Sequence, residues 1–288
     1  MEHCLRSNAN KHITTPNYNV TTCPSWEWSF VVSPEDRPHP DFEYPHTPMV
    51  KDRSEWTGLD ATGREKRLWR GHGRKVQPLE ELMESHEFKA TVEKARLVKD
   101  EIIALRLYTG PLYILYNGVL RDFPADVVRG LEGNRYETTL FVIISGVSKL
   151  SRATPIPPSR LLYRGLGGML LPEQFWIDRG AGFLGGVELG FMSTTTDRRV
   201  AIQYSGHERR RAAIFEIAAG RIDIGGALGF LSQYPGEEEF LMPPLSFLEV
   251  MGKPRVEATP NGQLLVFPMR VNVNLKSVTV EELTARRK

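Results

Sequence analysis

Three groups of residues have the types and spacing to do chemistry, and the first is an arginine followed by a glycine. Arg164 can present its planar guanidinium to a phosphate or a carboxylate, and Gly165 would let a ligand approach the backbone closely. The same arginine could instead be a solvated charge or one partner of a structural ion pair. The residues alone leave both interpretations of Arg164 open.

The second group is a row of hydroxyl side chains that follows an aromatic residue, in the segment 191–197. We expect Thr196 or Asp197 to cap a short helix, because these side chains accept hydrogen bonds from free N–H groups at a helix start. That interpretation leaves Ser193 and Thr194 without a role. On the last residues of a strand, their hydroxyls would point into a cleft and could orient a charged side chain.

The third group is an acid triplet, Glu237, Glu238 and Glu239, which runs directly into the apolar segment 240–242. These carboxylates could form an ordinary solvated turn. In a strand, Glu237 and Glu239 would share one face, about 6.6 Å apart along a chain that rises ~3.3 Å per residue. Two carboxylates at that spacing can perform different tasks at one glycosidic centre. A shift of one residue would bring Glu238 to that face, but continuity with 240–242 favours Glu239.

Strands are expected to position these three groups. Short runs typical of β-strands cover 161–166, 187–193, 212–217, 239–242, 247–251 and 264–274. A short helix is predicted over 197–204, between the second and third runs. Helices are expected before these strands, and that order indicates an α+β fold.

The chain before residue 155 has helical spacing instead. Apolar residues recur every three or four positions from Val92 to Leu105, which is typical of one helix face. Gly110 and Pro111 are expected to end that helix. Two further helices are predicted over 112–120 and 136–150.

Proline is concentrated at the start of the chain, where seven of the 20 prolines fall within the first 48 residues. Such a density breaks helices and removes backbone donors from sheets. Four of the five tryptophans also lie within 1–75, so parts of this segment should pack onto the rest of the protein. We therefore expect an extended, partly ordered arm over 1–75 and a folded domain over 76–288, helical in 76–150 and strand-rich in 160–280.

Glycines at 180, 182 and 185 match the spacing of a dinucleotide-binding fingerprint. A true fingerprint follows a strand and opens a helix. The next residues, 186–190, include two more glycines and would sustain a helix poorly. We interpret 180–185 as a flexible loop.

Composition excludes several classes of protein. With 288 residues, 41% hydrophobic and 25% charged, the chain is globular rather than disordered. The 37 basic and 35 acidic residues give a net charge of +2, which argues against nucleic-acid binding by bulk electrostatics. Two cysteines, Cys4 and Cys23, cannot build a disulfide framework or a cysteine zinc site, and they fit a reducing compartment. The N-terminal segment has no apolar core, so no secretory signal is visible, and the longest apolar run, 140–147, is too short for a membrane span. We therefore expect a cytoplasmic protein without a membrane partner.

In this order, the arginine, the aromatic-x-Ser-Thr-Thr segment and the Glu-x-Glu segment resemble the arginine–serine–glutamate class of mono-ADP-ribosyltransferases. This class is related to cholera-type and binary-type bacterial toxins and to animal ecto-enzymes. The segments 108–121 and 197–204 also resemble parts of such domains, and the resemblance covers roughly 78–280. Thr195 stands where the family usually has serine, which keeps the hydroxyl and adds a methyl group.

The resemblance implies a fold and a set of roles. It implies N-terminal helices followed by a two-sheet, antiparallel or mixed β core around an NAD⁺ cleft, with 76–288 as the catalytic domain. Glu239 would stabilise the oxocarbenium-like state that forms when the nicotinamide–ribose bond breaks, and Ser193 would hold its carboxylate. Arg164 would bind the phosphate side of NAD⁺, and the backbone of Gly165 the nicotinamide amide.

Four more residues receive roles from the resemblance. Phe191 would shape the floor of the cleft, and Thr194 and Thr195 would support it. Glu237 would orient an arginine acceptor and assist its deprotonation, because a guanidinium stays protonated at neutral pH. NAD⁺ is then the co-substrate, and no metal is required.

Three functions remain to be compared. The leading one is transfer of ADP-ribose from NAD⁺ to an accessible arginine of a protein. The second is NAD⁺ hydrolysis on the same fold, with water as the acceptor. The third is a catalytically silent binding module, which the intact arginine, serine and glutamates disfavour. The sequence leaves the first two open.

Overall fold

A computed structural model describes residues 79–272 of the chain, with gaps at 132–133, 157–159, 170, 178–183, 207–211, 220–224 and 260–261. The predicted arm over 1–75 lies outside the described residues. Residue contacts divide the chain into two compact units. Of the described residues, the first unit holds 79–143 without 94–96, together with 229–236, and the second unit holds the remainder, including every strand.

Six α-helices precede the first strand among the described residues: α3 Leu79–Met83, α4 His86–Ala95, α5 Lys99–Leu107, α6 Tyr113–Arg121, α7 Ala125–Gly130 and α8 Glu137–Ala153. The helices predicted over 112–120 and 136–150 correspond to α6 and α8, and α7 was not expected. The predicted stop at Gly110 and Pro111 is confirmed, because Gly110 leaves the helical region between α5 and α6 (φ −92°, ψ −165°). Helix resumes at once at Tyr113.

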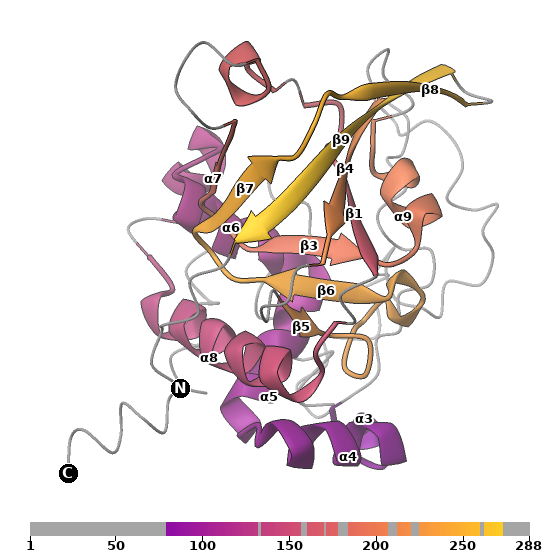
Figure 1. Cartoon of the computed structure of the whole chain (residues 1–288). Coiled ribbons are helices and arrows are strands. Elements are labelled where there is room, and N and C mark those ends of the chain that lie inside the picture. The colour runs from indigo at the N-terminus through magenta and orange to yellow at the C-terminus, as the bar shows by residue number, and fades with distance from the viewer. Residues whose placement is uncertain are drawn as a thin grey trace, which may run out of the picture. The chain divides into compact units, whose positions relative to one another are not determined.

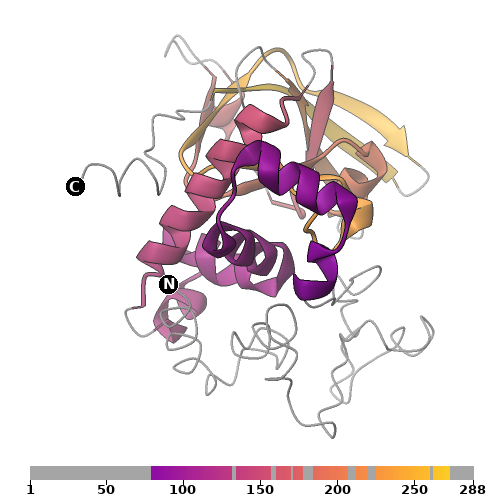
Figure 2. The same ribbon diagram turned by 90° about the horizontal axis from the view of Figure 1, so that it is seen from below.

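The single helix face predicted from Val92 to Leu105 is wrong. Arg96 adopts a left-handed backbone (φ 53°) and ends α4. The carboxylate of Glu101 then accepts a hydrogen bond from the backbone N–H of Val98 (2.9 Å), which caps the start of α5. Figures 1 and 2 show α4 and α5 running in different directions.

The described residues of the second unit form nine strands, in the order β2-β7-β9-β4-β1-β3-β6-β5 with β8 paired to β9. All pairs are antiparallel except β4 with β9. This mixed, mostly antiparallel sheet after a helical region confirms the α+β fold. The strands are β1 Leu161–Gly165, β2 Gly185–Glu188, β3 Met192–Thr195, β4 Ala212–Ala218, β5 Gly226–Ala227, β6 Glu239–Met242, β7 Ser246–Val250, β8 Arg255–Thr259 and β9 Gly262–Asn272.

The sheet turns at the junction of β1 and β3, which share one register pair, Tyr163 with Thr195. Figure 1 shows β3 and β6 lying across the direction of β4 and β9. The expected two-sheet core therefore takes the form of two sets of strands that meet at this junction. The functional residues predicted from the sequence lie on the strands of this junction or next to them.

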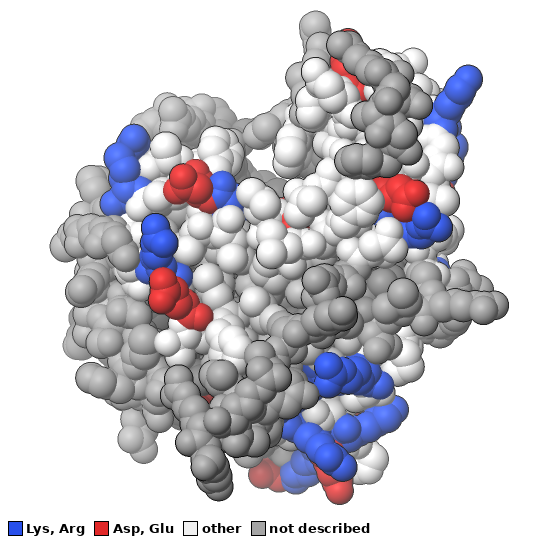
Figure 3. All heavy atoms as spheres, turned by 60° about the vertical axis from the view of Figure 1, so that its left-hand side comes forward, with Lys and Arg blue, Asp and Glu red and all other residues white. Residues whose placement is uncertain are grey.

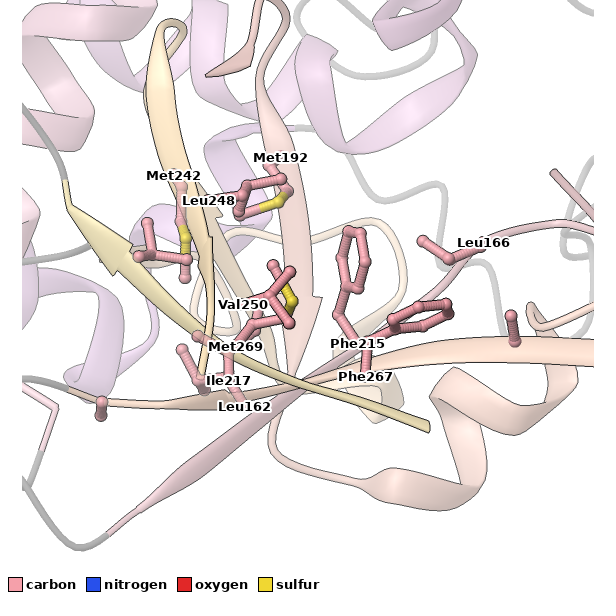
Figure 4. Close-up of a cluster of buried hydrophobic side chains, with 13 residues drawn as sticks. Leu162, Leu166, Met192, Phe215, Ile217, Met242, Leu248, Val250, Phe267 and Met269 are labelled. Carbon is pink, nitrogen blue, oxygen red and sulfur yellow. The ribbon is translucent and has the colours of Figure 1, made fainter. Parts of the chain in front are cut away.

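The main core of the second unit packs on one face of the sheet (Figure 4). Phe215 and Phe267 meet edge to face, with ring centroids 6.1 Å apart. Leu162 on β1 is fully buried in this core, which contributes about 1.5–3 kcal/mol to folding. The opposite face carries a smaller cluster that includes Ile214. Because both faces of β4 are covered, its sequence is nearly continuously apolar.

The strand predicted over 187–193 is two strands at different places in the sheet. β2 pairs with β7, whereas β3 lies between β1 and β6. The chain turns between them, where the carboxylate of Glu188 accepts a hydrogen bond from the N–H of Gly190 (2.8 Å). No helix follows Gly185, which opens β2 with φ 140°. A Cβ there would lie 1.8 Å from the carbonyl oxygen of Leu248, so packing against β7 requires this glycine.

Acidic side chains on the face drawn in Figure 3 commonly lie beside basic ones. In the second unit, Arg270 forms an ion pair with Glu249 (2.7 Å). Among the described helices, none combines the length and the apolar composition needed to cross a membrane. The described residues also contain no group of three or more histidine, cysteine, aspartate or glutamate side chains placed to hold a metal ion.

Candidate functional site

The predicted site residues gather on three neighbouring strands of the second unit. Arg164 and Gly165 end β1, Ser193 lies in β3, and Glu239 opens β6. β3 pairs with both β1 and β6, so it stands between the arginine and the acids. The sheet thus brings together residues that lie up to 75 positions apart in the sequence.

The guanidinium of Arg164 is directed at β3. Its Nη1 donates a hydrogen bond to the backbone carbonyl oxygen of Ser193 at 2.8 Å, and the side chain is partly buried. β1 and β3 share no register pair beyond Tyr163 with Thr195, so the guanidinium bridges the two strands where they diverge. The arginine is therefore fixed beside the serine that the sequence placed in the same site.

Ser193 and Glu239 are diagonal neighbours across β3 and β6. The register pairs Thr195 with Glu239 and Ser193 with Leu241. Residues in this relation share a face of the sheet and lie about 7–8 Å apart, within reach of a long side chain. A bond from the Ser193 hydroxyl to the Glu239 carboxylate remains a prediction that this register allows. Phe191 precedes β3 and is fully buried, so its ring would act on the site through packing.

Three consecutive threonines at the end of β3 and just after it bind the segment 237–240. Thr194 Oγ1 donates to the carbonyl oxygen of Phe240 (2.9 Å), and Thr195 Oγ1 donates to that of Glu237 (2.6 Å). Thr196 Oγ1 donates to the carboxylate of Glu238. The segment that carries the candidate acids is thereby held at two backbone carbonyls and at one carboxylate.

The predicted alternation of Glu237 and Glu239 along a strand is wrong. Glu237 ends a short 3₁₀ turn, Pro235–Glu237, and Glu238 has a left-handed backbone (φ 44°), so β6 begins only at Glu239. A left-handed residue other than glycine costs about 1–2 kcal/mol. Thr196 and Arg160 hold this conformation through the Glu238 carboxylate, with Arg160 Nη2 at 3.6 Å. The turn, rather than strand alternation, sets the relative direction of the two outer carboxylates.

The structure also assigns Glu239, and not Glu238, to strand β6. Glu239 is half-buried and opposite Thr195. Glu238 is exposed, with 58% of its side-chain surface accessible, and is turned toward Arg160.

Sequence reasoning missed a residue that binds the carboxylate of Glu237. The hydroxyl of Tyr204, at the end of helix α9 (Arg198–Gln203), donates to Glu237 Oε1 at 2.7 Å. The sequence indicated a helix over 197–204 but gave no signal for the direction of this side chain. Only the packing of α9 brings the phenol to a carboxylate 33 residues away.

Asp197 is the residue that caps α9, as one of the two sequence-based options proposed. Its carboxylate accepts from the backbone N–H of Arg199 (2.8 Å) and from that residue's guanidinium (2.7 Å). The hydrogen bonds from the Arg199 side chain and backbone lower the pKa of Asp197 below its ordinary value of 3.8. Its charged form therefore stabilises the fold above pH 3.8.

Asp197→Ala is expected to lower the free energy of unfolding at neutral pH by about 0.5–2 kcal/mol, because a helix N-cap is lost. Asp197→Asn should keep most of the cap and lose the contribution of the charge. Since the folded pKa is depressed, that contribution disappears as the pH falls through it. Urea unfolding of the wild type and Asp197→Asn at neutral and acid pH should show a difference that narrows in acid. A difference that widens in acid would refute this assignment.

The start of α9 is further fixed by a charge network. Arg198 binds Glu257 on β8, and Arg255 binds both Glu257 (3.0 Å) and Glu216 on β4 (2.8 Å). Burial alone would raise the pKa of Glu257, but the hydrogen bonds from Arg198 and Arg255 lower it. Burial raises the pKa of Tyr163, and the neighbouring Glu216 raises it further. α9 is thus tied to the sheet at the end opposite Tyr204.

Gly165 has a structural task besides any contact with a ligand. A Cβ at this position would lie 2.4 Å from the carbonyl oxygen of Ala201 and 2.4 Å from the carbonyl carbon of Tyr204. Both are backbone atoms of the α9 region, which cannot move away as a flexible side chain would. The glycine therefore allows the end of α9 to lie directly against β1.

Gly165→Ala is expected to lower the free energy of unfolding by about 1–3 kcal/mol, the usual cost of overpacking. Gly229→Ala is a suitable control, since a Cβ there meets nothing within 4 Å. Urea unfolding of the two variants should show a lower midpoint for Gly165→Ala alone. Equal midpoints for both variants would contradict the close approach at β1.

The candidate site residues lie within the part of the chain that matches a known protein family. The family model described as NAD:arginine ADP-ribosyltransferase matches residues 57–264, well over half of the chain. A GPI-linked NAD(P)(+)–arginine ADP-ribosyltransferase 1 of Oryctolagus cuniculus is 27% identical over 160 residues, which cover 55% of this chain and 45% of the relative. The chain thus matches less than half the length of this curated relative.

Solved structures of ADP-ribosyltransferases are also similar, at low identity. Plx2a, a toxin from Paenibacillus larvae, is 20% identical with a TM-score of 0.45, covering 67% of this chain and 96% of that chain. HopU1 of Pseudomonas syringae is 21% identical with a TM-score of 0.45, covering 64% and 83%.

Proposed function

This chain belongs to the NAD:arginine ADP-ribosyltransferase family, and from that premise we propose that it transfers ADP-ribose from NAD⁺ to an arginine side chain of a protein, releasing nicotinamide. The observation that carries the proposal is the meeting of Arg164, Ser193 and Glu239 on the neighbouring strands β1, β3 and β6. A cation for the phosphates, a hydroxyl and a carboxylate for the ribose are the groups that NAD⁺ cleavage needs in one place.

The bond that breaks joins the anomeric carbon of the ribose to the nicotinamide nitrogen. Positive charge grows on the ribose as the nicotinamide leaves with the bonding electrons. The fixed carboxylate of Glu239 stabilises that charge more strongly in the transition state than in the ground state, which is the requirement for catalysis. Ser193 would keep this carboxylate in place, and Arg164 would hold the phosphates, with the Gly165 backbone at the nicotinamide amide.

The acceptor must lose a proton as its nitrogen bonds to the anomeric carbon. A guanidinium with a pKa above about 12 is a poor nucleophile until that proton leaves. Glu237 lies two residues before Glu239, and its carboxylate is fixed by Tyr204. We assign to it the binding of the guanidinium and the acceptance of the proton.

We further propose that no metal takes part and that the partners are NAD⁺ and a protein, rather than nucleic acid or a membrane. Glu239 and Arg164 already supply the negative and positive charges that a metal would otherwise provide. The near-balanced charge of the chain, +2, supports a protein acceptor over a nucleic acid. Addition of a chelator such as EDTA should leave the rate unchanged.

The test is incubation of the whole chain with NAD⁺ labelled in the ADP-ribose part and with polyarginine as the acceptor. Label on polyarginine supports transfer. Free labelled ADP-ribose without labelled polyarginine would identify a hydrolase instead. Intact NAD⁺ at the end of the reaction would identify a silent binding module.

A further inference from the structure

Tyr204 makes a direct contact with Glu237, the carboxylate to which we assign the binding of the acceptor arginine. Its hydroxyl lies 2.7 Å from Glu237 Oε1 in a partly buried position. A separation this short is typical of a charge-assisted O–H···O⁻ bond. A carboxylate has about four lone-pair positions, so one phenol fixes its plane and leaves the others for a guanidinium.

The backbone of Tyr204 is held as firmly as its hydroxyl. Its carbonyl oxygen accepts from the N–H of Gly167 (2.8 Å), and its N–H donates to the carbonyl of Val200 (3.2 Å). Gly165 lies so close that an added Cβ would meet the Tyr204 carbonyl group at 2.4–2.5 Å. The end of β1 therefore determines where the phenol stands.

The segment from β3 to α9 therefore fixes both the backbone and the side chain of Glu237. Thr195 Oγ1 donates to the carbonyl of Glu237 (2.6 Å) and accepts from the N–H of Asp197 (3.0 Å), which caps α9. Tyr204, at the other end of the same helix, holds the Glu237 carboxylate. The residues at the two ends of this short helix thus hold the backbone and the side chain of the same acid.

We propose that Tyr204 is a positioning residue for the acceptor arginine, acting through Glu237. The inference rests on the proposed function, because Glu237 matters only if a guanidinium is the acceptor. The phenol holds the carboxylate in the orientation that receives the guanidinium and takes its proton. Hydrolysis of NAD⁺, which needs Glu239 and water, does not require that orientation.

Tyr204→Phe tests this role, because it removes the hydroxyl and keeps the ring. Transfer to polyarginine should fall about tenfold in kcat/KM, equivalent to about 1.4 kcal/mol, whereas release of free ADP-ribose in the absence of acceptor should stay unchanged. Tyr113→Phe is the matched control, since Tyr113 is also half-buried but lies on α6 in the first unit. The control should leave both rates unchanged.

A double-mutant cycle separates positioning from a general structural role. In a Glu237→Ala background, Tyr204→Phe should cause no further loss of transfer, because the residue it acts through is gone. An equal loss of transfer and hydrolysis in Tyr204→Phe, or an additive loss in the double variant, would overturn the inference. Wild-type chain that cleaves NAD⁺ without labelling polyarginine would instead overturn the proposed function itself, so the two failures are distinguishable.

Discussion

Glu239→Gln is expected to abolish NAD⁺ cleavage, and with it transfer, while the protein stays folded. Glutamine has nearly the same shape but no charge, so it cannot stabilise the positive ribose of the transition state. Removal of one preorganised electrostatic group from an active site lowers kcat by on the order of 10²–10³, and we expect a loss at the upper end. Nicotinamide release is the measurement, because it reports cleavage whether water or arginine is the acceptor.

The control for this variant is its neighbour in the triplet. Glu238 is exposed and bound to Thr196 and Arg160, so Glu238→Gln should keep most of the NAD⁺ cleavage activity. The thermal unfolding temperature should be similar for both variants, since neither glutamate is fully buried. Full cleavage by Glu239→Gln would show that the catalytic carboxylate has been assigned to the wrong residue, and loss of cleavage in Glu238→Gln alone would identify the shifted frame.

Those parts of the fold that depend on local pattern could be predicted from the sequence. β6 was expected over 239–242 and is observed as Glu239–Met242, because a short apolar run ends at two prolines that cannot continue a ladder. β4 was found because its residues are apolar on both faces. The cap of α9 could be narrowed to Thr196 or Asp197, because both residue types are common at a helix start, and the structure identifies Asp197.

The parts that depend on neighbours distant in sequence could not be predicted. The run 187–193 has the composition of one strand, and only the sheet order separates β2 at an edge from β3 between β1 and β6. The triplet looked like alternating strand residues, but the left-handed Glu238 is stabilised by Thr196 and Arg160. A sequence pattern cannot contain that stabilisation, because its donors lie more than 40 positions away.

The hydroxyl side chains of 194–196 have acceptors that differ in part from those predicted. The sequence suggested that hydroxyls at the end of β3 orient a charged side chain. Thr194 and Thr195 instead bind backbone carbonyls of the acid segment, and Thr196 binds the Glu238 carboxylate. The site is thus positioned mainly through the backbone of the acids, with Tyr204 acting on the Glu237 side chain.

Glu237→Gln is expected to separate the two reactions of the site. Transfer to arginine should fall by about 10²–10⁴, the usual contribution of a general base, because an amide cannot take the proton of the guanidinium. Hydrolysis should persist, since Glu239 still stabilises the ribose and water needs less help to lose its proton to the solvent. The measurement is the ratio of labelled polyarginine to free ADP-ribose from the same labelled NAD⁺.

Glutamine is the informative substitution here because its amide oxygen can still accept the bond from Tyr204. The shape of the site and the contact of Thr195 with the Glu237 backbone are kept, so the change isolates the charge. Glu249→Gln is a matched control on β7, where the acid pairs with Arg270 outside the triplet. A parallel fall of transfer and hydrolysis in Glu237→Gln would assign this acid to bond cleavage rather than to the acceptor. In that case both outer acids would serve the ribose, and the choice of acceptor would have to come from residues beyond the triplet.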